Sequence, residues 1–396
     1  MLSELELIGR KNLLFTQDMQ LNHKSISKEI KRSKILVLGG AGSIGQAVVK
    51  EIFSKNPMKL HVVDLNENNL AELVRDLRSS SGYISGDFKT FCLDIGTIEY
   101  DAFIKSTCNY DYVLNLSALK HVRSERDPFT LMRMLNVNII NTVKTIEQSI
   151  QMGAKKYFCV STDKAANPVN LMGASKLIME YFLSAYTDQI DISTARFANV
   201  AFSDGSLLHS FEKRISKRQP IVAPNDIKRY FVTHKEAGQL CLLAAFDGEN
   251  NEVFFPKLSE ELHLITFSSI AVKFLKMHNR VPYLCNSEIQ ARNAIGDLNT
   301  NKEWPCLFTK SDTTGEKDFE EFYTDAECLM LDKYLNIGII KKSLIFDKSI
   351  LKSFLLGLND LKENQNWKKT DIIKLIRLVL PDFKYSDNGK YLDGKM

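Results

Sequence analysis

Residues 34–45 read KILVLGGAGSIG, a short apolar run followed directly by a glycine-rich turn. The apolar run predicts a buried strand, and the pattern from Ser43 and Ile44 onward predicts a helix. The turn carries three glycines at G-x-x-G-x-x-G spacing, which are Gly39, Gly42 and Gly45. Glycines at this spacing allow a tight turn, a close approach of the backbone to a pyrophosphate, and close packing of helix on strand. The free N–H groups at the helix N-terminus would face the phosphates, so the stretch predicts a dinucleotide-binding βα unit.

The same alternation of apolar runs and helical patterns continues to about residue 200. Strand-like runs are KLHVVD, FKTFCLD, YDYVLNLS, KKYFCVST and IDISTARF. Alternation at this spacing predicts an α/β fold with a Rossmann-type doubly wound parallel sheet over residues 34–200. We expect residues 201–330 to form mainly a smaller mixed α/β substrate lobe, interleaved with the first domain. Residues 1–33 and 331–396 are expected to be helical terminal extensions.

Composition narrows the class of protein. The 396 residues carry a formal charge of +4, which gives no case for nucleic acid as a partner. The seven cysteines form no CxxC pair, so we expect reduced thiols and no metal site. The first residues lack the apolar core of a signal peptide, and no apolar run reaches transmembrane length. We therefore expect a cytoplasmic protein without a membrane partner.

Residues that follow the other strands complete the expected cofactor site. Asp64 ends the second strand, where it would accept hydrogen bonds from the adenosine ribose and repel a 2′-phosphate. No arginine follows it directly, so NAD is favoured over NADP. Asp94 and Ile95 are placed to meet the adenine, although Asp94 could equally be a polar strand end. Leu116 and Ala118, after the fourth strand, are further expected cofactor contacts.

A polar turn follows the fifth strand. Thr162, Asp163 and Lys164 leave the carboxyl end of KKYFCV, where ligands bind in this architecture. An isolated TDK is usually a solvated turn, but Met172 and Lys176 follow at i, i+4 spacing on one helix face. This is the YxxxK spacing of short-chain dehydrogenases with methionine in place of tyrosine. A neighbouring carboxyl and amine form an acid and base pair that suits β-elimination next to a carbonyl.

STDKAANPVNLMGASK, together with GGAGSIG, LSALKHV and ARFANVAFSDGSL, resembles the nucleotide-sugar 4,6-dehydratases of the extended short-chain dehydrogenase superfamily. More narrowly, the chain is similar to the soluble UDP-N-acetylglucosamine 4,6-dehydratases of bacterial bacillosamine and legionaminic acid pathways. The resemblance covers about residues 34–330, and GEKDFEEF at 315–322 matches a late family signature. The family usually has arginine and proline just before GEK, where this chain has Thr313 and Thr314. That departure puts the nucleotide preference in doubt.

The resemblance implies a mechanism. NAD⁺ takes hydride from C4 of the hexose, Lys164 removes the C5 proton, Asp163 protonates the departing C6 hydroxyl, and the hydride returns to C6. Because Met172 cannot take the C4 hydroxyl proton, we expect Thr162 to orient that hydroxyl and Asp163 to take its proton, while Met172 shapes the pocket. Lys176 keeps the family role at the nicotinamide ribose. Relatives with methionine at this position retain the C5 configuration, which predicts the D-xylo product.

Further roles follow from the same resemblance. Lys120 and His121 would lie near the sugar or the nicotinamide, and Asn199 and Ser206 would contact the pyrophosphate. Arg229 and Lys317 are candidates to neutralise phosphate charge.

The resemblance also implies an assembly, because the helical segments around 129–151 and 170–186 form an intersubunit four-helix bundle in related enzymes. We therefore expect a homodimer or a higher homo-oligomer. Three alternatives stay open: a C5-inverting or GDP-sugar dehydratase, a nucleotide-sugar 4-epimerase, and an NAD-binding protein without catalysis.

Overall fold

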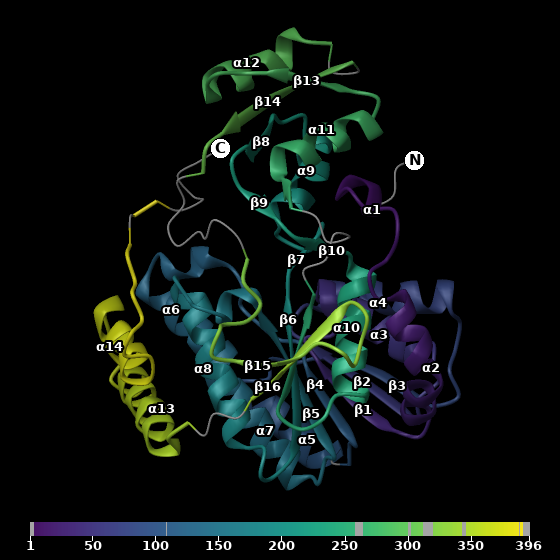
Figure 1. Cartoon of the computed structure of the whole chain (residues 1–396), viewed down its shortest axis with the longest axis vertical. Coiled ribbons are helices and arrows are strands. Elements are labelled where there is room, and N and C mark those ends of the chain that lie inside the picture. The colour runs from purple at the N-terminus through teal and green to yellow at the C-terminus, as the bar shows by residue number, and fades with distance from the viewer. Residues whose placement is uncertain are drawn as a thin grey trace.

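The computed structural model describes residues 4–107, 109–257, 264–299, 302–311, 320–342, 346–387 and 389–390 (Figure 1). Within these residues the apolar runs of the sequence form one large sheet. Its strands are β1 (Lys34–Leu38), β2 (Lys59–Asp64), β3 (Asp87–Cys92), β4 (Tyr112–Asn115), β5 (Lys156–Thr162), β6 (Asp191–Phe197), β11 (Glu252–Pro256), β15 (Cys328–Met330) and β16 (Ile337–Lys341).

The strand order confirms the predicted Rossmann-type fold. Among the described residues the sheet has nine strands in the order β15-β16-β11-β6-β5-β4-β1-β2-β3. From β1 the chain winds through β2 and β3 on one side and through β4, β5 and β6 on the other, always parallel. β11 continues the parallel order, whereas β16 and β15 add an antiparallel edge. The order reverses between β1 and β4, where ligands bind in doubly wound sheets.

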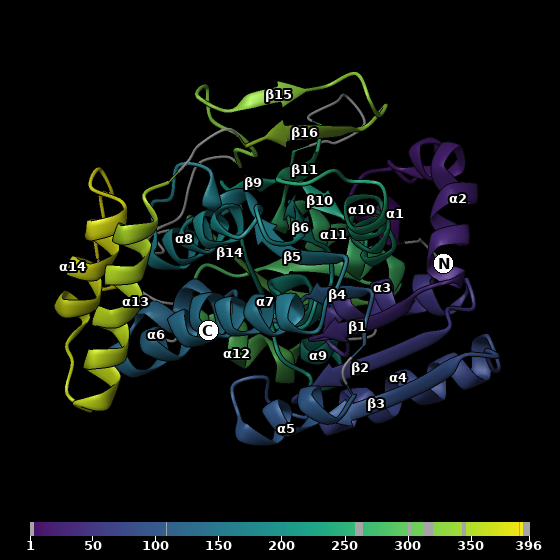
Figure 2. The ribbon, with the colours of Figure 1, turned by 90° about the horizontal axis from the view of Figure 1, so that it is seen from below.

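Helices cover both faces of the sheet (Figure 2). One layer contains α2 (Thr16–Lys31), α3 (Ser43–Phe53), α4 (Glu67–Ser80) and α10 (His234–Phe246). The other contains α5 (Ile98–Thr107), α6 (Pro128–Leu135), a π-helical turn (Asn136–Ile140), α7 (Asn141–Gln151) and α8 (Leu171–Ala185). Side chains of β1 alternate between the layers, since Ile35 and Val37 belong to the first core and Leu36 and Leu38 to the second. Burial on both faces explains why β1 reads as a continuous apolar run.

A smaller lobe lies beyond the carboxyl ends of the strands (Figure 1). Its parallel sheet has the order β13-β14-β8, formed by β8 (Ile221–Pro224), β13 (Val281–Leu284) and β14 (Glu303–Thr309). Helices of the lobe are α1 (Glu4–Leu7), α9 (Leu207–Ser216), α11 (Phe267–Met277) and α12 (Glu288–Asp297). Two short pairs lie between the bodies: β7 (Asn199–Val200) with β10 (Phe231–Val232), and β9 (Lys228–Arg229) with β12 (Ile265–Thr266).

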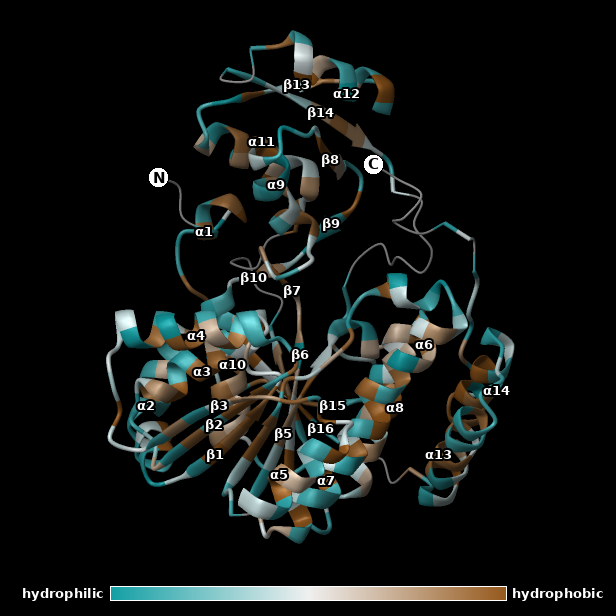
Figure 3. Cartoon of the chain, turned by 180° about the vertical axis from the view of Figure 1, so that it is seen from behind, coloured by the Kyte–Doolittle hydropathy of each residue, from teal (hydrophilic) through white to brown (hydrophobic). Residues whose placement is uncertain are grey.

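The expected terminal extensions are divided differently in the structure. The N-terminal segment contains α1, whose Leu7 packs in the core of the small lobe, and α2, which packs on the main sheet. Residues 331–396 are not helical throughout, because β16 lies inside the main sheet. The run IGII at 337–340 is buried and pairs with β11, so its burial on both faces explains the strand. Figure 3 shows the apolar residues gathered on the strands of this sheet.

The C-terminal helices α13 (Lys348–Glu363) and α14 (Lys369–Val379) form a hairpin that packs on α6 and α8 (Figure 2). The hairpin is held by apolar contacts, since Phe354 is fully buried and its ring lies 6.4 Å from that of Phe182. The indole N–H of Trp367 donates to Pro128 O at 2.9 Å. The chain's own hairpin thus covers the parts of α6 and α8 that it contacts. The expected homo-oligomer with a four-helix bundle stays a prediction. None of the described helices is long and apolar enough to cross a membrane.

Candidate active site

The glycine turn after β1 has the close contacts that the sequence predicts. Gly39 has a φ of +71°, and a Cβ there would lie 2.7 Å from Ser117 N of the loop after β4. A Cβ at Gly45 would collide with the Gly39 carbonyl oxygen and lie 2.7 Å from the Cα of Gly40. By contrast, a Cβ at Gly42 would meet its nearest neighbour, Gly39 O, at 3.7 Å. The turn is therefore packed on the protein side and open at Gly42, the N-cap of α3.

Two carboxylates follow the neighbouring strands. Asp64 accepts Ala41 N of the glycine turn at 2.9 Å and Asn66 N at 2.9 Å. Asp94 accepts Gly96 N at 2.8 Å and pairs with Arg133 at 2.8 Å. Burial alone would raise the pKa of Asp94, but these two partners together lower it. Both carboxylates thus lie beside the expected cofactor position, and Asp94 also holds α6.

Three apolar residues, Ile95, Leu116 and Ala118, are also expected to contact the cofactor. Ile95 is buried, whereas Leu116 and Ala118 are half-buried. Leu116 N donates to Leu38 O at 2.8 Å, which places the loop after β4 against the glycine turn.

The polar turn after β5 forms a compact acid and base cluster. The Thr162 hydroxyl donates to Asp163 Oδ1 at 2.7 Å, and Lys164 Nζ lies 3.1 Å from Oδ1 and 3.2 Å from Oδ2. The Asp163 side chain is 4% exposed and that of Lys164 29% exposed. The carboxylate is thus enclosed while the ammonium reaches solvent. A solvated turn would expose both groups, so this burial argues against that interpretation.

Helix α8 is fitted tightly behind this turn. A Cβ at Gly173 would collide with the Lys164 carbonyl oxygen, so glycine lets the helix approach the turn. The Met172 side chain is buried, and its backbone N–H donates to Glu125 Oε1 at 2.8 Å. Burial raises the pKa of Glu125 to about 7, although backbone N–H groups of Met172 and Leu171 oppose this shift. Sequence analysis singled out neither Gly173 nor Glu125.

Lys176 lies deep in the same helix. Its Nζ donates to Val160 O at 3.0 Å and contacts Met179 Sδ at 3.5 Å. Burial lowers the pKa of this lysine, although nearby Cys159 and Glu180 favour its charged form. Its ammonium therefore lies beneath the end of β5, next to the polar turn.

The loop after β4 meets the segment before α9. Lys120 Nζ donates to Ser203 Oγ at 3.3 Å, and desolvation lowers its pKa despite its exposed stem and the opposing charge of Asp204. His121 packs on Gly205, where a Cβ would lie 3.0 Å from His121 Nε2. Burial, together with the charges of Lys120 and Arg123, lowers the pKa of His121 and favours the neutral imidazole.

Two further links reach this segment. Asp204 N donates to Ser43 Oγ at 2.8 Å, which joins it to the start of α3. Ser206 is the N-cap of α9 and accepts His209 N at 3.2 Å, so its hydroxyl already serves the helix.

Two residues predicted to contact the diphosphate meet at a third that was not predicted. Asn199 Nδ2 donates to Glu320 Oε1, and Arg229 Nε lies 3.6 Å from the same oxygen. Lys317 lies outside the described residues. Glu320 belongs to the GEKDFEEF motif, so the motif was the available signal for it.

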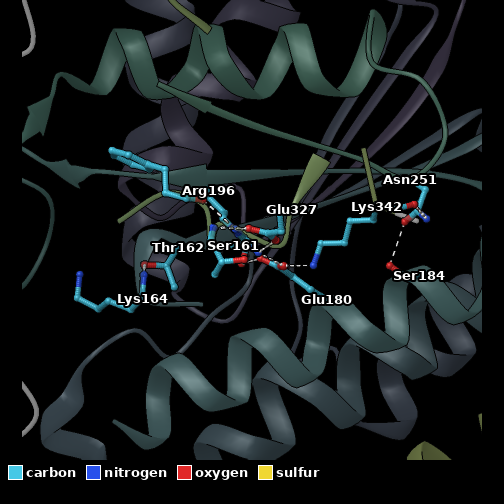
Figure 4. Close-up of polar contacts among 11 residues, drawn as sticks. Ser161, Thr162, Lys164, Glu180, Ser184, Arg196, Asn251, Glu327 and Lys342 are labelled. Atoms are coloured by element: carbon cyan, nitrogen blue, oxygen red, sulfur yellow. Dashed lines mark hydrogen bonds and ion pairs between the residues drawn. The ribbon is translucent and has the colours of Figure 1, made fainter. Parts of the chain in front are cut away.

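A buried ion network supports the polar turn from below (Figure 4). Arg196 of β6 pairs with Glu180 of α8 at 2.7 Å and with Glu327 at 2.8 Å. Glu180 also binds Lys342 and accepts a hydrogen bond from Ser161, the neighbour of Thr162, at 2.6 Å. Desolvation would raise the pKa of Glu180, but Arg196 and Lys342 hold it far below its ordinary value. The network thus joins β5, β6 and α8, which carry the site, to the residues beside the edge strands β15 and β16.

Proteins of similar sequence are known. Residues 35–327 match the family model described as polysaccharide biosynthesis protein. An uncharacterized membrane protein of Methanocaldococcus jannaschii, MJ1061, is 34% identical over 59% of this chain and 69% of its own length. The capsular polysaccharide biosynthesis protein CapD of Staphylococcus aureus is 26% identical over 68% of this chain, but only 45% of its own length. A UDP-N-acetylglucosamine 4,6-dehydratase (inverting) of Campylobacter jejuni is 30% identical over 57% of this chain and 66% of its length.

Solved structures share the fold. Pen from Bacillus thuringiensis has a TM-score of 0.62 at 23% identity, over 80% of this chain and 90% of its own. A UDP-glucuronic acid 4-epimerase from Bacillus cereus, solved with NAD and a UDP-sugar, has a TM-score of 0.56 at 18% identity, over 74% and 90%. Since the family model spans most of the described chain, including the glycine turn and the polar turn, the chain belongs to the polysaccharide biosynthesis protein family.

Proposed function

We propose that the protein dehydrates UDP-N-acetylglucosamine across C5 and C6, with NAD as a recycled cofactor, to give the UDP-linked 4-keto-6-deoxy sugar for bacterial surface-glycan or nonulosonic acid synthesis. The observation that carries this proposal is the Asp163–Lys164 pair, whose charged groups lie 3.1 Å apart at the end of β5. The similarity to two proteins named UDP-N-acetylglucosamine 4,6-dehydratase (inverting) supports the dehydration and the sugar substrate, but it does not support the C5 configuration proposed below.

The residues of the glycine turn fit NAD. Gly42 leaves open space at the N-terminus of α3, and no side chain caps that terminus, so its N–H groups can bind a pyrophosphate. Each oxygen of Asp64 accepts one backbone N–H, which leaves lone pairs for ribose hydroxyls and a charge that repels a 2′-phosphate. When bound, NAD supplies a hydride acceptor for C4 and returns that hydride at C6. We assign Lys176 to the nicotinamide ribose.

The residues of the polar turn can carry out the proton transfers at C4, C5 and C6 in the proposed reaction. Thr162 orients the C4 hydroxyl, and Asp163 takes its proton. Once protonated, Asp163 no longer stabilises an ammonium by charge, so Lys164, whose side chain is 29% exposed, releases a proton to solvent and becomes the neutral amine. That amine removes the C5 proton, and Asp163 gives its proton to the C6 hydroxyl, which leaves as water. Lys164 then returns a proton to C5 from the same side, so the C5 configuration is retained.

The first experiment is incubation of the purified protein with UDP-N-acetylglucosamine in deuterated water without added NAD, followed by mass spectrometry and proton NMR. We expect loss of one water and deuterium at C5, because the partly exposed Lys164 exchanges its protons with solvent. The couplings give the C5 configuration, and an inverted product would contradict the proposed role of Lys164. Substrate that stays unchanged, also with NAD or with the GDP-linked sugar, would refute the proposal.

Two variants test the assignment of the protons. Asp163→Asn should abolish turnover, whereas Met172→Ala should keep measurable activity because the thioether takes no proton. A Met172→Ala protein that folds and binds NAD but is inactive would contradict this assignment.

A 4-epimerase is the second candidate, favoured by the fold shared with a solved 4-epimerase. An epimerase needs no acid at C6 and normally uses the tyrosine that Met172 replaces. In the same experiment it would give a product of unchanged mass with altered C4 stereochemistry.

A further inference from the structure

Glu320 is a buried carboxyl group between the two lobes. Its side chain is 3% exposed. Oε1 accepts a hydrogen bond from Asn199 Nδ2, and Oε2 accepts Tyr230 N at 3.2 Å. Arg229 Nε lies 3.6 Å from Oε1. One carboxyl group therefore holds two of the four residues that we expect near the substrate diphosphate, Asn199 and Arg229.

The charged groups of the polar turn act on this carboxyl group. Burial raises the pKa of Glu320 to about 7, and the negative charge of Asp163 adds to the rise. Arg229, Lys164 and the N–H of Tyr230 oppose it. Glu320 in turn raises the pKa of Tyr230, although burial contributes more. Glu320 thus gains or loses a proton near neutral pH, and the charge of Asp163 acts on this equilibrium.

This placement affects the proposed reaction. Asp163 has to accept a proton from C4 and later donate it at C6, so its proton affinity has to suit both steps. A negative charge favours protonation of a second carboxyl group that it reaches, and the charge of Asp163 acts on Glu320 in this way.

We propose that Glu320 is a positioning residue that fixes Asn199 and Arg229 at the substrate diphosphate, and that it is coupled by charge to Asp163. The proposal rests on the proposed dehydratase function, but the charge coupling can be measured without turnover. The matched control is Glu321, the next residue of the same motif, which is half-buried and lies 3.5 Å from Asn167 Nδ2.

The test without turnover is infrared difference titration of the carboxyl stretch. Wild type and Glu321→Gln should both show two carboxyl groups that titrate near pH 7, Glu125 and Glu320, and Glu320→Gln should show Glu125 alone. The difference between the two titrations gives the Glu320 midpoint. In Asp163→Asn this midpoint should move to lower pH, because the charge that raises the pKa of Glu320 is gone. A midpoint that stays in place in Asp163→Asn would overturn the charge coupling, whether or not the protein is a dehydratase.

The kinetic test uses the pH dependence of kcat/KM, which reports groups of the free enzyme. The wild-type profile should change slope near pH 7, and Glu320→Gln should lose this feature and about tenfold in kcat/KM, the factor that corresponds to one pKa unit. Thermal unfolding and bound NAD should match wild type, which excludes misfolding as the cause. A Glu320→Gln profile that superimposes on that of the wild type would overturn the positioning role. Absence of turnover in the wild type would refute the dehydratase function and leave the infrared result standing.

Discussion

Replacing Arg196 by methionine tests whether the buried ion network holds the site together. The Arg196 side chain is 1% exposed. It donates two hydrogen bonds to Glu180, at 2.9 and 2.7 Å, and two to Glu327, at 2.9 and 2.8 Å. A fifth goes to Phe322 O at 2.8 Å. Methionine has a similar length but can make none of these bonds.

The expected cost follows from what is left behind. Glu180 is 1% exposed and would retain Lys342 and Ser161, while Glu327 is 12% exposed and would retain the N–H of Thr324. Of the two carboxylates, Glu180 would then keep Lys342 as a cationic partner, whereas Glu327 would keep only the backbone N–H. Removing one partner of a buried ion pair costs about 3–5 kcal/mol because it leaves an uncompensated charge. We therefore expect Arg196→Met to lose about 3–5 kcal/mol in the free energy of unfolding.

Urea unfolding followed by circular dichroism measures this loss. The control is Arg75→Met on α4, since Arg75 and its partner Glu72 are 73% and 70% exposed. An exposed pair contributes about 0–1 kcal/mol, so the control should remain close to wild type. Turnover of Arg196→Met should also fall at temperatures where it stays folded, because Ser161 directly precedes Thr162. An Arg196→Met protein as stable as Arg75→Met would show that the network does not stabilise the fold, and would refute this reasoning.

Two further substitutions test the cofactor turn and the C-terminal hairpin. Gly45→Ala places a methyl group 2.7 Å from the Gly40 Cα, so it should lose about 1–3 kcal/mol of stability and copurify with less NAD, whereas Gly296→Ala, with nothing within 4 Å, should behave as wild type. Equal NAD content in the two variants would contradict the role of the turn. Phe354→Ala should lose about 3–5 kcal/mol on urea unfolding, because the ring is fully buried, whereas Leu356→Ala at a 54% exposed position should change little. Light scattering should then show self-association of Phe354→Ala through the uncovered α8. A Phe354→Ala protein that matches Leu356→Ala in both urea unfolding and light scattering would argue against the packing of the hairpin.

Features set by neighbouring residues could be predicted from the sequence. The strand at 34–38, its glycine turn and the polar turn after β5 each depend on a few consecutive residues with a periodic pattern. The positive φ of Gly39 and the pairing of Asp163 with Lys164 are local in the same sense. The conformation of these features therefore depends mainly on the local sequence.

Features that depend on distant contacts could not be predicted. Glu320 meets Asn199 across 121 positions, and its burial depends on how the small lobe sits on the main sheet. Likewise, the helical pattern of α13 predicts an amphipathic helix, but it does not say whether the helix packs on the body of the protein or on a partner chain. The run at 337–340 is too short for periodicity to separate a strand from a buried helix. In each case tertiary packing determines the contact, and the pattern of a single sequence does not show which distant residues pack together.

The loss of the tyrosine is compatible with catalysis if the Asp163–Lys164 pair closes the proton cycle by itself. In the proposed reaction, Lys164 would take the C5 proton and become an ammonium 3.1 Å from Asp163, which would favour the carboxylate. Two unit charges 4 Å apart attract by about 4 kcal/mol at an effective dielectric constant of ~20. Proton abstraction at C5 would therefore promote release of the Asp163 proton to the C6 hydroxyl, the step that completes the proposed elimination. Because each transfer would prepare the next within one pair, this proposal requires no ionisable group at the position of Met172.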